Sequence, residues 1–239
     1  MTNNLKKMLY LGINRFKQKN LKNEYIRWLS YANAGMLHWG NLYCIDLAIK
    51  NLPSNNPVLE IGSFCGLSTN IISFLLCKYE KTNKLISADK WIFGGVIDDK
   101  NVGESHISFK EYSKFVKSSF KRNTEFFSSK NKPFTIEAFS DEFFELWDGN
   151  KKAIDVFNRE IQLGGKISFC YIDGNHKYSF TKRDFVNVDK YLDIGGYILF
   201  DDSNDFGGFG AGKFMKEMKK NIRYKLVIKN PNYLFQKLA

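Results

Sequence analysis

Residues 58–69 read Val-Leu-Glu-Ile-Gly-Ser-Phe-Cys-Gly-Leu-Ser-Thr, a short apolar run with one acid, followed by two glycines. The run predicts a buried strand, Gly62 and Gly66 predict a tight turn, and the residues that follow predict a helix start. Glycine lacks a Cβ, so its backbone can adopt positive φ and allow a ligand to approach closely. The N–H groups of the new helix, with the hydroxyls of Ser63 and Ser68, can receive an anion. The segment therefore predicts a nucleotide-like ligand at the carboxyl end of the first strand.

The spacing of these residues narrows the class of ligand. Glu60-x-Gly-x-x-x-Gly66 differs from the Gly-x-Gly-x-x-Gly pattern of dinucleotide-binding proteins. The segment from Glu60 to Ser68 resembles motif I of class I S-adenosylmethionine-dependent methyltransferases. Its Phe-Cys-Gly-Leu-Ser variant is similar to the catechol-type, metal-dependent O-methyltransferases. The resemblance implies that Glu60, Gly62, Ser63, Gly66 and Ser68 belong to the S-adenosylmethionine site, where the glycines and the following amides hold the methionine part.

Composition favours a single α/β domain of ordinary hydrophobicity. The chain has 239 residues, enough for one full core, and contains no apolar run that approaches the roughly 20 residues of a membrane span. The net charge of +11 invites a nucleic-acid partner, but the lysines are spread along the whole chain. We therefore expect a solvated basic surface and discount nucleic acid. Cys44, Cys65, Cys77 and Cys170 lack metal or redox spacing, which predicts reduced core thiols in a cytoplasmic protein.

Strand and helix patterns alternate along the chain. The predicted strands are 58–61, 84–88, 134–138, 166–172, 196–200, 224–229 and 233–237. The predicted helices are 67–80, 108–128, 142–147, 151–161, 179–192 and 211–221, and 94–107 is expected to be a loop. This alternation predicts a Rossmann-like, doubly wound and mostly parallel sheet with ligands at the carboxyl ends of its strands. The short turn before the last strand predicts an antiparallel C-terminal hairpin, and the methyltransferase resemblance implies seven strands in all.

The N-terminal region is predicted to be a helical extension. Residues 3–20 and 22–50 carry helical periodicity, so we divide the chain into an extension, 1–52, and a methyltransferase domain, 53–239. The extension could close over the cofactor or form an interface between two copies of the chain. A basic amphipathic helix at 5–21 could instead hold the protein peripherally at the inner membrane surface. The sequence leaves these alternatives open.

Polar residues follow the second and third predicted strands. Asp89 closes the second strand, where an acid can accept hydrogen bonds from a ribose diol, although it could also cap a turn. Trp91 could flank an adenine or lie in the core. Ser140 and Asp141 follow the third strand, where the resembled family contacts the adenine, but either residue could simply start the next helix. We assign Asp89, Trp91, Ser140 and Asp141 to the cofactor site.

Three carboxylates follow the fourth and fifth strands. Asp173 ends the fourth strand, and Asp201 and Asp202 end the fifth. Because these strands are neighbours in this topology, we expect the three carboxylates to meet at one edge of the sheet. Such acids raise each other's pKa unless a cation neutralises them, and oxygen ligands suit Mg²⁺. The alternative is that Asp201 caps a turn while Asp202 faces water.

The residues around these acids extend the resemblance to about 58–205. Asp173-Gly-Asn-His176, followed by Gly-Gly-x-x-x-x-Asp201-Asp202, is similar to bacterial small-molecule O-methyltransferases of the macrocin and sugar-modifying type. The resemblance implies that Asp173, Asp201 and Asp202 bind Mg²⁺, that Asp173 also adjoins the cofactor, and that His176 is the general base. An imidazole, with an ordinary pKa of about 6.5, suits proton removal from a hydroxyl. The expected acceptor is a hydroxyl group of a small molecule, sugar or glycan.

Three other functions remain as alternatives. A nucleic-acid methyltransferase that acts on amino groups would carry an Asn/Asp-Pro-Pro-aromatic motif after the fourth strand, where this chain has Asp173-Gly-Asn-His. Asn230-Pro-Asn-Tyr233 mimics that motif, but it falls between the last two strands and is predicted to be a turn. A non-catalytic protein that binds S-adenosylmethionine or a glycan would not need its acidic residues, which are costly to bury without a ligand. A nicotinamide oxidoreductase would need the dinucleotide spacing.

Overall fold

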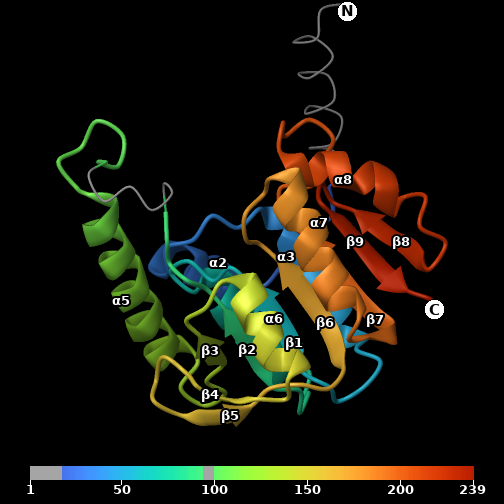
Figure 1. The fold of residues 1–239 in the computed structure, drawn as a ribbon, viewed down its shortest axis with the longest axis horizontal. Coiled ribbons are helices and arrows are strands. Elements are labelled where there is room, and N and C mark those ends of the chain that lie inside the picture. The colour runs from blue at the N-terminus through green and yellow to red at the C-terminus, as the bar shows by residue number, and fades with distance from the viewer. Residues whose placement is uncertain (1–17, 94–99) are drawn as a thin grey trace, which may run out of the picture.

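Seven strands form the central sheet in the computed structural model, which describes residues 18–93 and 100–239 (Figure 1). Their order across the sheet is β3 (Phe134–Ile136), β2 (Leu85–Ala88), β1 (Val58–Ile61), β6 (Ile167–Ile172), β7 (Leu192–Phe200), β9 (Tyr233–Lys237) and β8 (Tyr224–Lys229). The first five strands in this order are parallel, whereas β9 runs antiparallel to β7 and to β8. The prediction of a mostly parallel sheet with an antiparallel C-terminal hairpin is confirmed.

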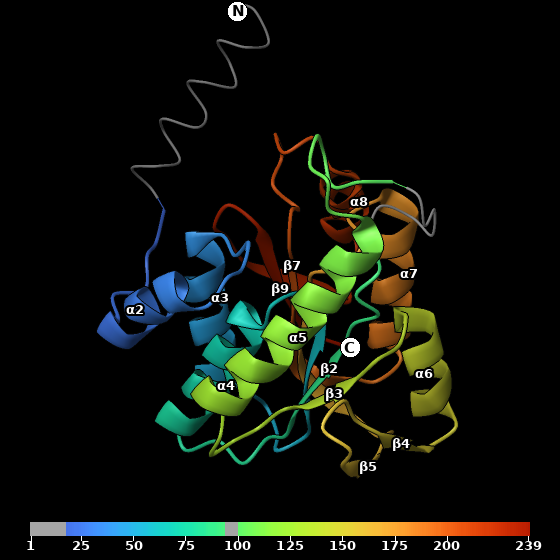
Figure 2. The ribbon, with the colours of Figure 1, turned by 90° about the vertical axis from the view of Figure 1, so that its left-hand side faces the viewer.

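Helices cover both faces of the sheet (Figure 2). One face carries α3 (Trp39–Lys50) and α4 (Leu67–Lys78), and α2 (Glu24–Ala32) and α5 (Phe109–Phe127) pack against α4. The other face carries α6 (Ser140–Asp148), α7 (Tyr178–Asp189) and α8 (Gly210–Met218). Apolar side chains beneath the two layers form the two largest core clusters. Strands β1 and β6 are buried along their whole length, which explains why their sequences are almost continuously apolar.

The helical region predicted over 22–50 is two helices. Helix α2 ends at Asn33, whose backbone is extended and whose side chain donates to the carbonyls of Ala34 and Cys65, at 2.8 Å and 3.0 Å. Helix α3 begins after His38, whose Nδ1 accepts a hydrogen bond from the N–H of Gly40 at 3.0 Å. Polar side chains therefore end one helix and start the next, so the helical periodicity over 22–50 corresponds to two separate helices. Between the two helices, Gly35 lies directly against Leu67, the first residue of α4.

The helix predicted at 151–161 was also wrong. The segment forms a small antiparallel pair of strands, β4 (Lys152–Ile154) and β5 (Glu160–Gln162). Asp155 Oδ1 accepts from the N–H groups of Phe157 and Arg159, at 2.9 Å and 2.8 Å, and Asn158 has a φ of +59°. These local hydrogen bonds close a tight turn, because a short aspartate side chain competes with the helical hydrogen-bonding pattern.

The prediction that the cysteines lie in the core is confirmed for three of the four. Cys44, Cys65 and Cys170 are buried free thiols, as expected, whereas Cys77 is exposed.

In the described part of the chain, every helix is too short or too polar to cross a membrane. Most of the predicted basic helix at 5–21, and residues 94–99 of the predicted loop, lie outside the described residues. The division of the chain after residue 52 stays a prediction.

Candidate functional site

A cavity of about 630 Å³ lies at the carboxyl ends of the central strands, a volume that suits a cofactor-sized molecule. Its walls come from the ends of β1, β2, β6 and β7, from the start of α6, and from residues 35–37 between α2 and α3. Of the predicted site residues, those that line it are Gly62, Ser63, Ser68, Asp89, Trp91, Ser140, Asp173, His176, Asp201 and Asp202. Glu60, Gly66 and Asp141 are not among the described residues that line it.

The glycine turn lies directly against the end of the neighbouring strand. Gly62 has a φ of +87°, and a Cβ at this position would lie 2.1 Å from the carbonyl oxygen of Asp173. A side chain is therefore excluded both by backbone conformation and by space. Gly66, with a φ of +90°, directly precedes α4, so the first turn of that helix presents Ser68 to the cavity.

Asp89 holds this turn in place. Its Oδ2 accepts from the N–H groups of Ser63 and Phe64, at 2.8 Å and 2.9 Å, and its Oδ1 accepts from the N–H of Trp91 at 2.6 Å. A carboxylate has about four acceptor positions, so capacity for a ribose hydroxyl remains. Trp91 packs on Phe120 and donates its indole N–H to the carbonyl of Phe64 at 2.9 Å. The ribose contact of Asp89 and the adenine contact of Trp91 both stay predictions.

Glu60 is fully buried beneath the turn. Its Oε2 accepts hydrogen bonds from the hydroxyls of Thr69 and Ser63. Its Oε1 has no hydrogen-bond partner among the described residues. Burial raises the pKa of Glu60 to about 7, although hydroxyl hydrogen bonds from Ser68 and Thr69 oppose the change. The carboxyl group therefore takes up a proton close to neutral pH.

This raised pKa predicts a pH-dependent effect of Glu60→Gln on stability. The pKa lies at about 7 in the folded protein against an ordinary value of 4.5, so between these values the unfolded chain ionises while the folded protein keeps the proton. Folded protein then binds more protons, so the stability of the wild type falls, relative to the variant, as pH rises through this window. The relative loss should reach roughly 3 kcal/mol above neutral pH. Urea unfolding of both proteins from about pH 5 to about pH 8 measures it, and a constant difference between them contradicts the assignment.

Asp184 was not among the predicted residues, yet it lines the cavity beside Ser140. Its side chain is buried, and its Oδ1 has no hydrogen-bond partner within the described ranges. Burial raises the pKa of Asp184 to about 6, against the opposing effect of the Ser140 hydroxyl. Asp141 instead forms an ion pair of 2.7 Å with Arg183, which also lines the cavity. The sequence contains a signal for Asp184, because it interrupts the apolar stripe on the buried face of α7.

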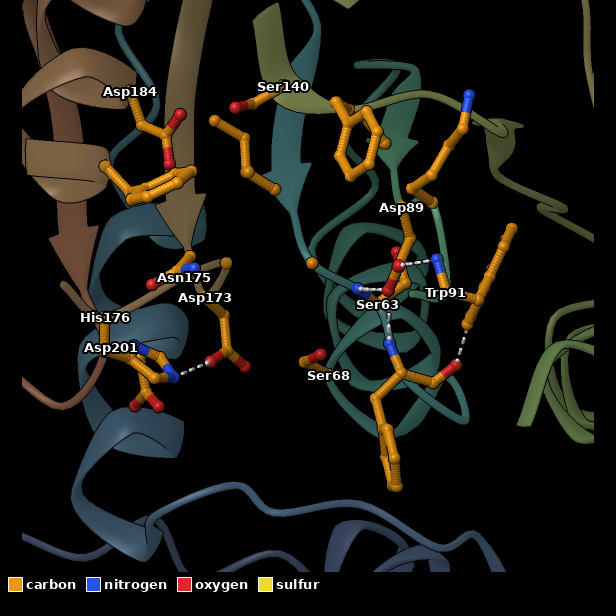
Figure 3. A pocket seen from close by; sticks show the side chains of 18 of the residues that line it. Ser63, Ser68, Asp89, Trp91, Ser140, Asp173, Asn175, His176, Asp184 and Asp201 are labelled. Atoms are coloured by element: carbon orange, nitrogen blue, oxygen red, sulfur yellow. Dashed lines mark hydrogen bonds and ion pairs between the residues drawn. The ribbon is translucent and has the colours of Figure 1, made fainter. Parts of the chain in front are cut away.

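The predicted acidic set does converge at the opposite side of the cavity. Strands β6 and β7 pair in parallel, which brings Asp173 next to Asp201 and Asp202. One ligand atom each from Asp173, His176 and Asp201 lies within 4.8 Å of the others. His176 Nε2 lies 3.8 Å from Asp173 Oδ1 and 3.6 Å from Asp202 Oδ2. Figure 3 shows Asp173, His176 and Asp201 gathered across the cavity from Ser63, Asp89 and Trp91.

The electrostatics of this set suit a bound cation. Burial, and then the neighbouring Asp201 carboxylate, raise the pKa of Asp173 well above its ordinary value. Burial and Asp201 also raise the pKa of Asp202, while His176 opposes this change. A divalent cation removes the repulsion that causes part of these changes, and carboxylate oxygens are the ligands that Mg²⁺ prefers. The donor set therefore fits the predicted magnesium ion.

Three further residues at this end of the cavity were missed. His38 lies close enough to Asp201 and Asp202 for both carboxylates to act on its pKa, which burial lowers overall. Its Nδ1 accepts from a backbone N–H, so the neutral ring carries its proton on Nε2. Asn41 and Asn232 both donate hydrogen bonds to Asp201. The Asn230–Tyr233 segment does connect β8 and β9, as predicted, but it also reaches the acidic set.

A family model described as a methyltransferase domain matches residues 59–203. Among curated proteins, the uncharacterized protein R132 of Acanthamoeba polyphaga mimivirus is 26% identical over 148 residues, which make up 62% of this chain and 52% of that protein. The chain therefore spans about half the length of this curated relative.

Solved structures share the fold. CalS11, a TDP-rhamnose 3'-O-methyltransferase of calicheamicin biosynthesis, is 15% identical, with 82% of this chain and 78% of that chain covered and a TM-score of 0.54. TomG from Streptomyces achromogenes, an O-methyltransferase of tomaymycin synthesis solved in complex with SAM, is 10% identical, with both chains covered in full and a TM-score of 0.56. The same seven-stranded architecture is thus common to this chain and to these enzymes.

Proposed function

The chain belongs to the methyltransferase-domain family, and on that premise we propose that it is an S-adenosylmethionine-dependent O-methyltransferase that uses Mg²⁺ and acts on a hydroxyl group of a small molecule or sugar. One observation carries the proposal. A single cavity joins a glycine turn at one side to a set of three carboxylates and a histidine at the other. A cofactor and a hydroxyl acceptor can therefore meet inside it.

The residues on the glycine side fit S-adenosylmethionine. A Cβ at Gly62 would overlap the Asp173 carbonyl, so glycine lets the turn lie against the end of β6, where it lines the cavity. The N–H groups at the start of α4 and the hydroxyls of Ser63 and Ser68 would hold the methionine part. Asp89 would bind the ribose. Asp184 Oδ1 has no hydrogen-bond partner in the described part of the chain, so a bound adenine could supply an N–H donor to this oxygen.

The residues on the acidic side would prepare the acceptor. Bound S-adenosylmethionine supplies an electrophilic methyl group, and Mg²⁺ on Asp173, Asp201 and Asp202 would lower the pKa of an acceptor hydroxyl. His176 would remove the hydroxyl proton with its Nε2, which lies near the carboxylates of Asp173 and Asp202. Those carboxylates would stabilise the positive charge of the protonated ring. The walls of the cavity would align the acceptor oxygen with the methyl group, because such transfer depends chiefly on position.

The class of acceptor rests on similarity. CalS11, which shares the fold, methylates a hydroxyl group of a nucleotide-linked sugar, as its name states. That likeness supports a sugar hydroxyl as the first acceptor to screen for this chain. Residues 35–37, which line the cavity near His38, would contact part of the acceptor or cofactor.

A calorimetric titration with S-adenosylhomocysteine tests the cofactor assignment. Saturable binding to one site per chain is expected, because the product retains every group that the turn, Asp89 and Asp184 would bind. Methyl transfer to a panel of sugar and small-molecule hydroxyls is then measured with Mg²⁺ and with a chelator, which should abolish it. Folded protein that does not bind S-adenosylhomocysteine contradicts the proposal. Binding without transfer to any hydroxyl acceptor favours a non-catalytic binding protein instead.

A further inference from the structure

Two asparagines from opposite ends of the chain hold one carboxylate of the acidic set. Asn41 lies in α3, and Asn232 lies in the turn between β8 and β9. The side-chain N–H groups of both residues donate to the same oxygen of Asp201, Oδ1, and the Asn232 bond measures 3.0 Å. The exposed fractions of Asn41, Asn232 and Asp201 are 0%, 2% and 6%, so water does not compete for these bonds.

The orientation of both amides follows from their other hydrogen bonds. Asn232 Nδ2 also donates to Asn41 Oδ1 at 3.1 Å, and Asn232 Oδ1 accepts from the N–H of Asn204 at 3.1 Å. Asn41 Nδ2 lies 3.3 Å from the hydroxyl oxygen of Tyr171. The oxygen of Asn232 is thus identified by the N–H of Asn204, and the oxygen of Asn41 by the Nδ2 of Asn232, so the Nδ2 of each amide is the atom that faces Asp201. The arrangement is a connected network and not two independent contacts.

We infer that Asn41 and Asn232 are positioning residues for Asp201 as a metal ligand. The inference rests on the proposed function, because it takes Asp201 to bind Mg²⁺. Two donors on Oδ1 fix the plane of the carboxylate, and Oδ2 would be the oxygen offered to the cation. Partners that orient a ligand in this way commonly change metal affinity by about 10-fold to 100-fold.

The network connects the acidic set to residues outside the region that matches the family model. Asn41 and Asn232 both lie beyond the region that matches the methyltransferase-domain family. The N-terminal helix α3 and the C-terminal hairpin therefore contribute to the cation site, although neither supplies a ligand. This gives the N-terminal extension a chemical role as well as a structural one.

Titration of the full chain with Mn²⁺, followed by electron paramagnetic resonance, tests the inference. Asn41→Leu and Asn232→Leu remove the donors and keep the number and branching of the side-chain heavy atoms. Each variant should weaken Mn²⁺ binding by about 10-fold or more, while S-adenosylhomocysteine binding without metal changes by less than about 2-fold. Asn83→Leu is the matched control. Asn83 is equally buried and donates to the carbonyls of Ser54 and Asn56, but it lies just before β2, at the end of the sheet opposite the cavity.

Each outcome bears on a different statement. Folded variants that bind Mn²⁺ as tightly as the wild type overturn the inference and leave the proposed function intact. Parallel loss of Mn²⁺ and S-adenosylhomocysteine affinity assigns the network a merely structural role and also overturns it. A wild type that binds S-adenosylhomocysteine but no Mn²⁺ refutes the metal part of the proposed function itself. Because the two asparagines lie in different elements, a variant that does not fold at one position leaves the other to decide.

Discussion

Replacing Asp201 with asparagine is expected to lower the rate of methyl transfer by about 10³-fold. A cation bound at the acidic set would lower the activation free energy by about 4 kcal/mol, which corresponds to this factor. The new amide keeps an oxygen that can accept from Asn41 and Asn232, so the local fold should persist. The variant lacks one of the three negative charges that would bind the cation. Affinity for S-adenosylhomocysteine should change by less than about 3-fold, because the glycine turn and Asp89 lie across the cavity.

The measurements are methyl transfer to the acceptor found by the screen and Mg²⁺ binding by calorimetry. His176→Ala serves as the comparison, since a general base contributes about 10²-fold to 10⁴-fold to the rate without holding the metal. It should therefore lose transfer yet retain Mg²⁺ binding. If His176→Ala loses the metal as well, His176 is a ligand and not a base. If Asp201→Asn transfers methyl groups at the wild-type rate, the metal site is misassigned.

Gly62→Ala is expected to cost roughly 3 kcal/mol or more of unfolding free energy. The φ of +87° is unfavourable for any residue with a side chain, and the new Cβ would lie 2.1 Å from the carbonyl oxygen of Asp173. Relief of that overlap requires β1 and β6 to separate at their carboxyl ends, where the glycine turn and Asp173 lie. Binding of S-adenosylhomocysteine and of Mg²⁺ should therefore weaken together. Thermal unfolding and both titrations measure these effects.

Gly165→Ala is the matched control for backbone strain. Gly165 has a φ of +83°, and a Cβ there would meet nothing within 4 Å. This substitution should lower the unfolding free energy only by the cost of the backbone conformation, about 1–2 kcal/mol. The affinities for S-adenosylhomocysteine and Mg²⁺ should not change. Equal losses of stability at the two glycines would show that conformation alone is responsible and that the close approach of the turn to β6 matters little.

The sequence predicted the fold well because the relevant signals are local. Apolar runs of four to six residues mark β1, β2 and β6, and helical periodicity between them implies parallel strands. Parallel strands place all their carboxyl ends at one edge, so Gly62, Asp89, Asp173 and Asp201 could be assigned to one site without coordinates. The segment 151–161 was misassigned because its structure depends on side-chain hydrogen bonds from Asp155, which periodicity does not register.

The sheet, the glycine turn and the convergence of the acids were thus predictable from the chain alone, since strand order and spacing set all three. The residues that surround them depend on how distant elements pack. Asn41 and Asn232 are 191 positions apart in the chain, yet they share a hydrogen bond and one oxygen of Asp201. His38 reaches the same end of the cavity because the segment between α2 and α3 runs along the cavity, which its residues 35–37 line. Such contacts are set by how distant elements pack, and no spacing within a single motif encodes them.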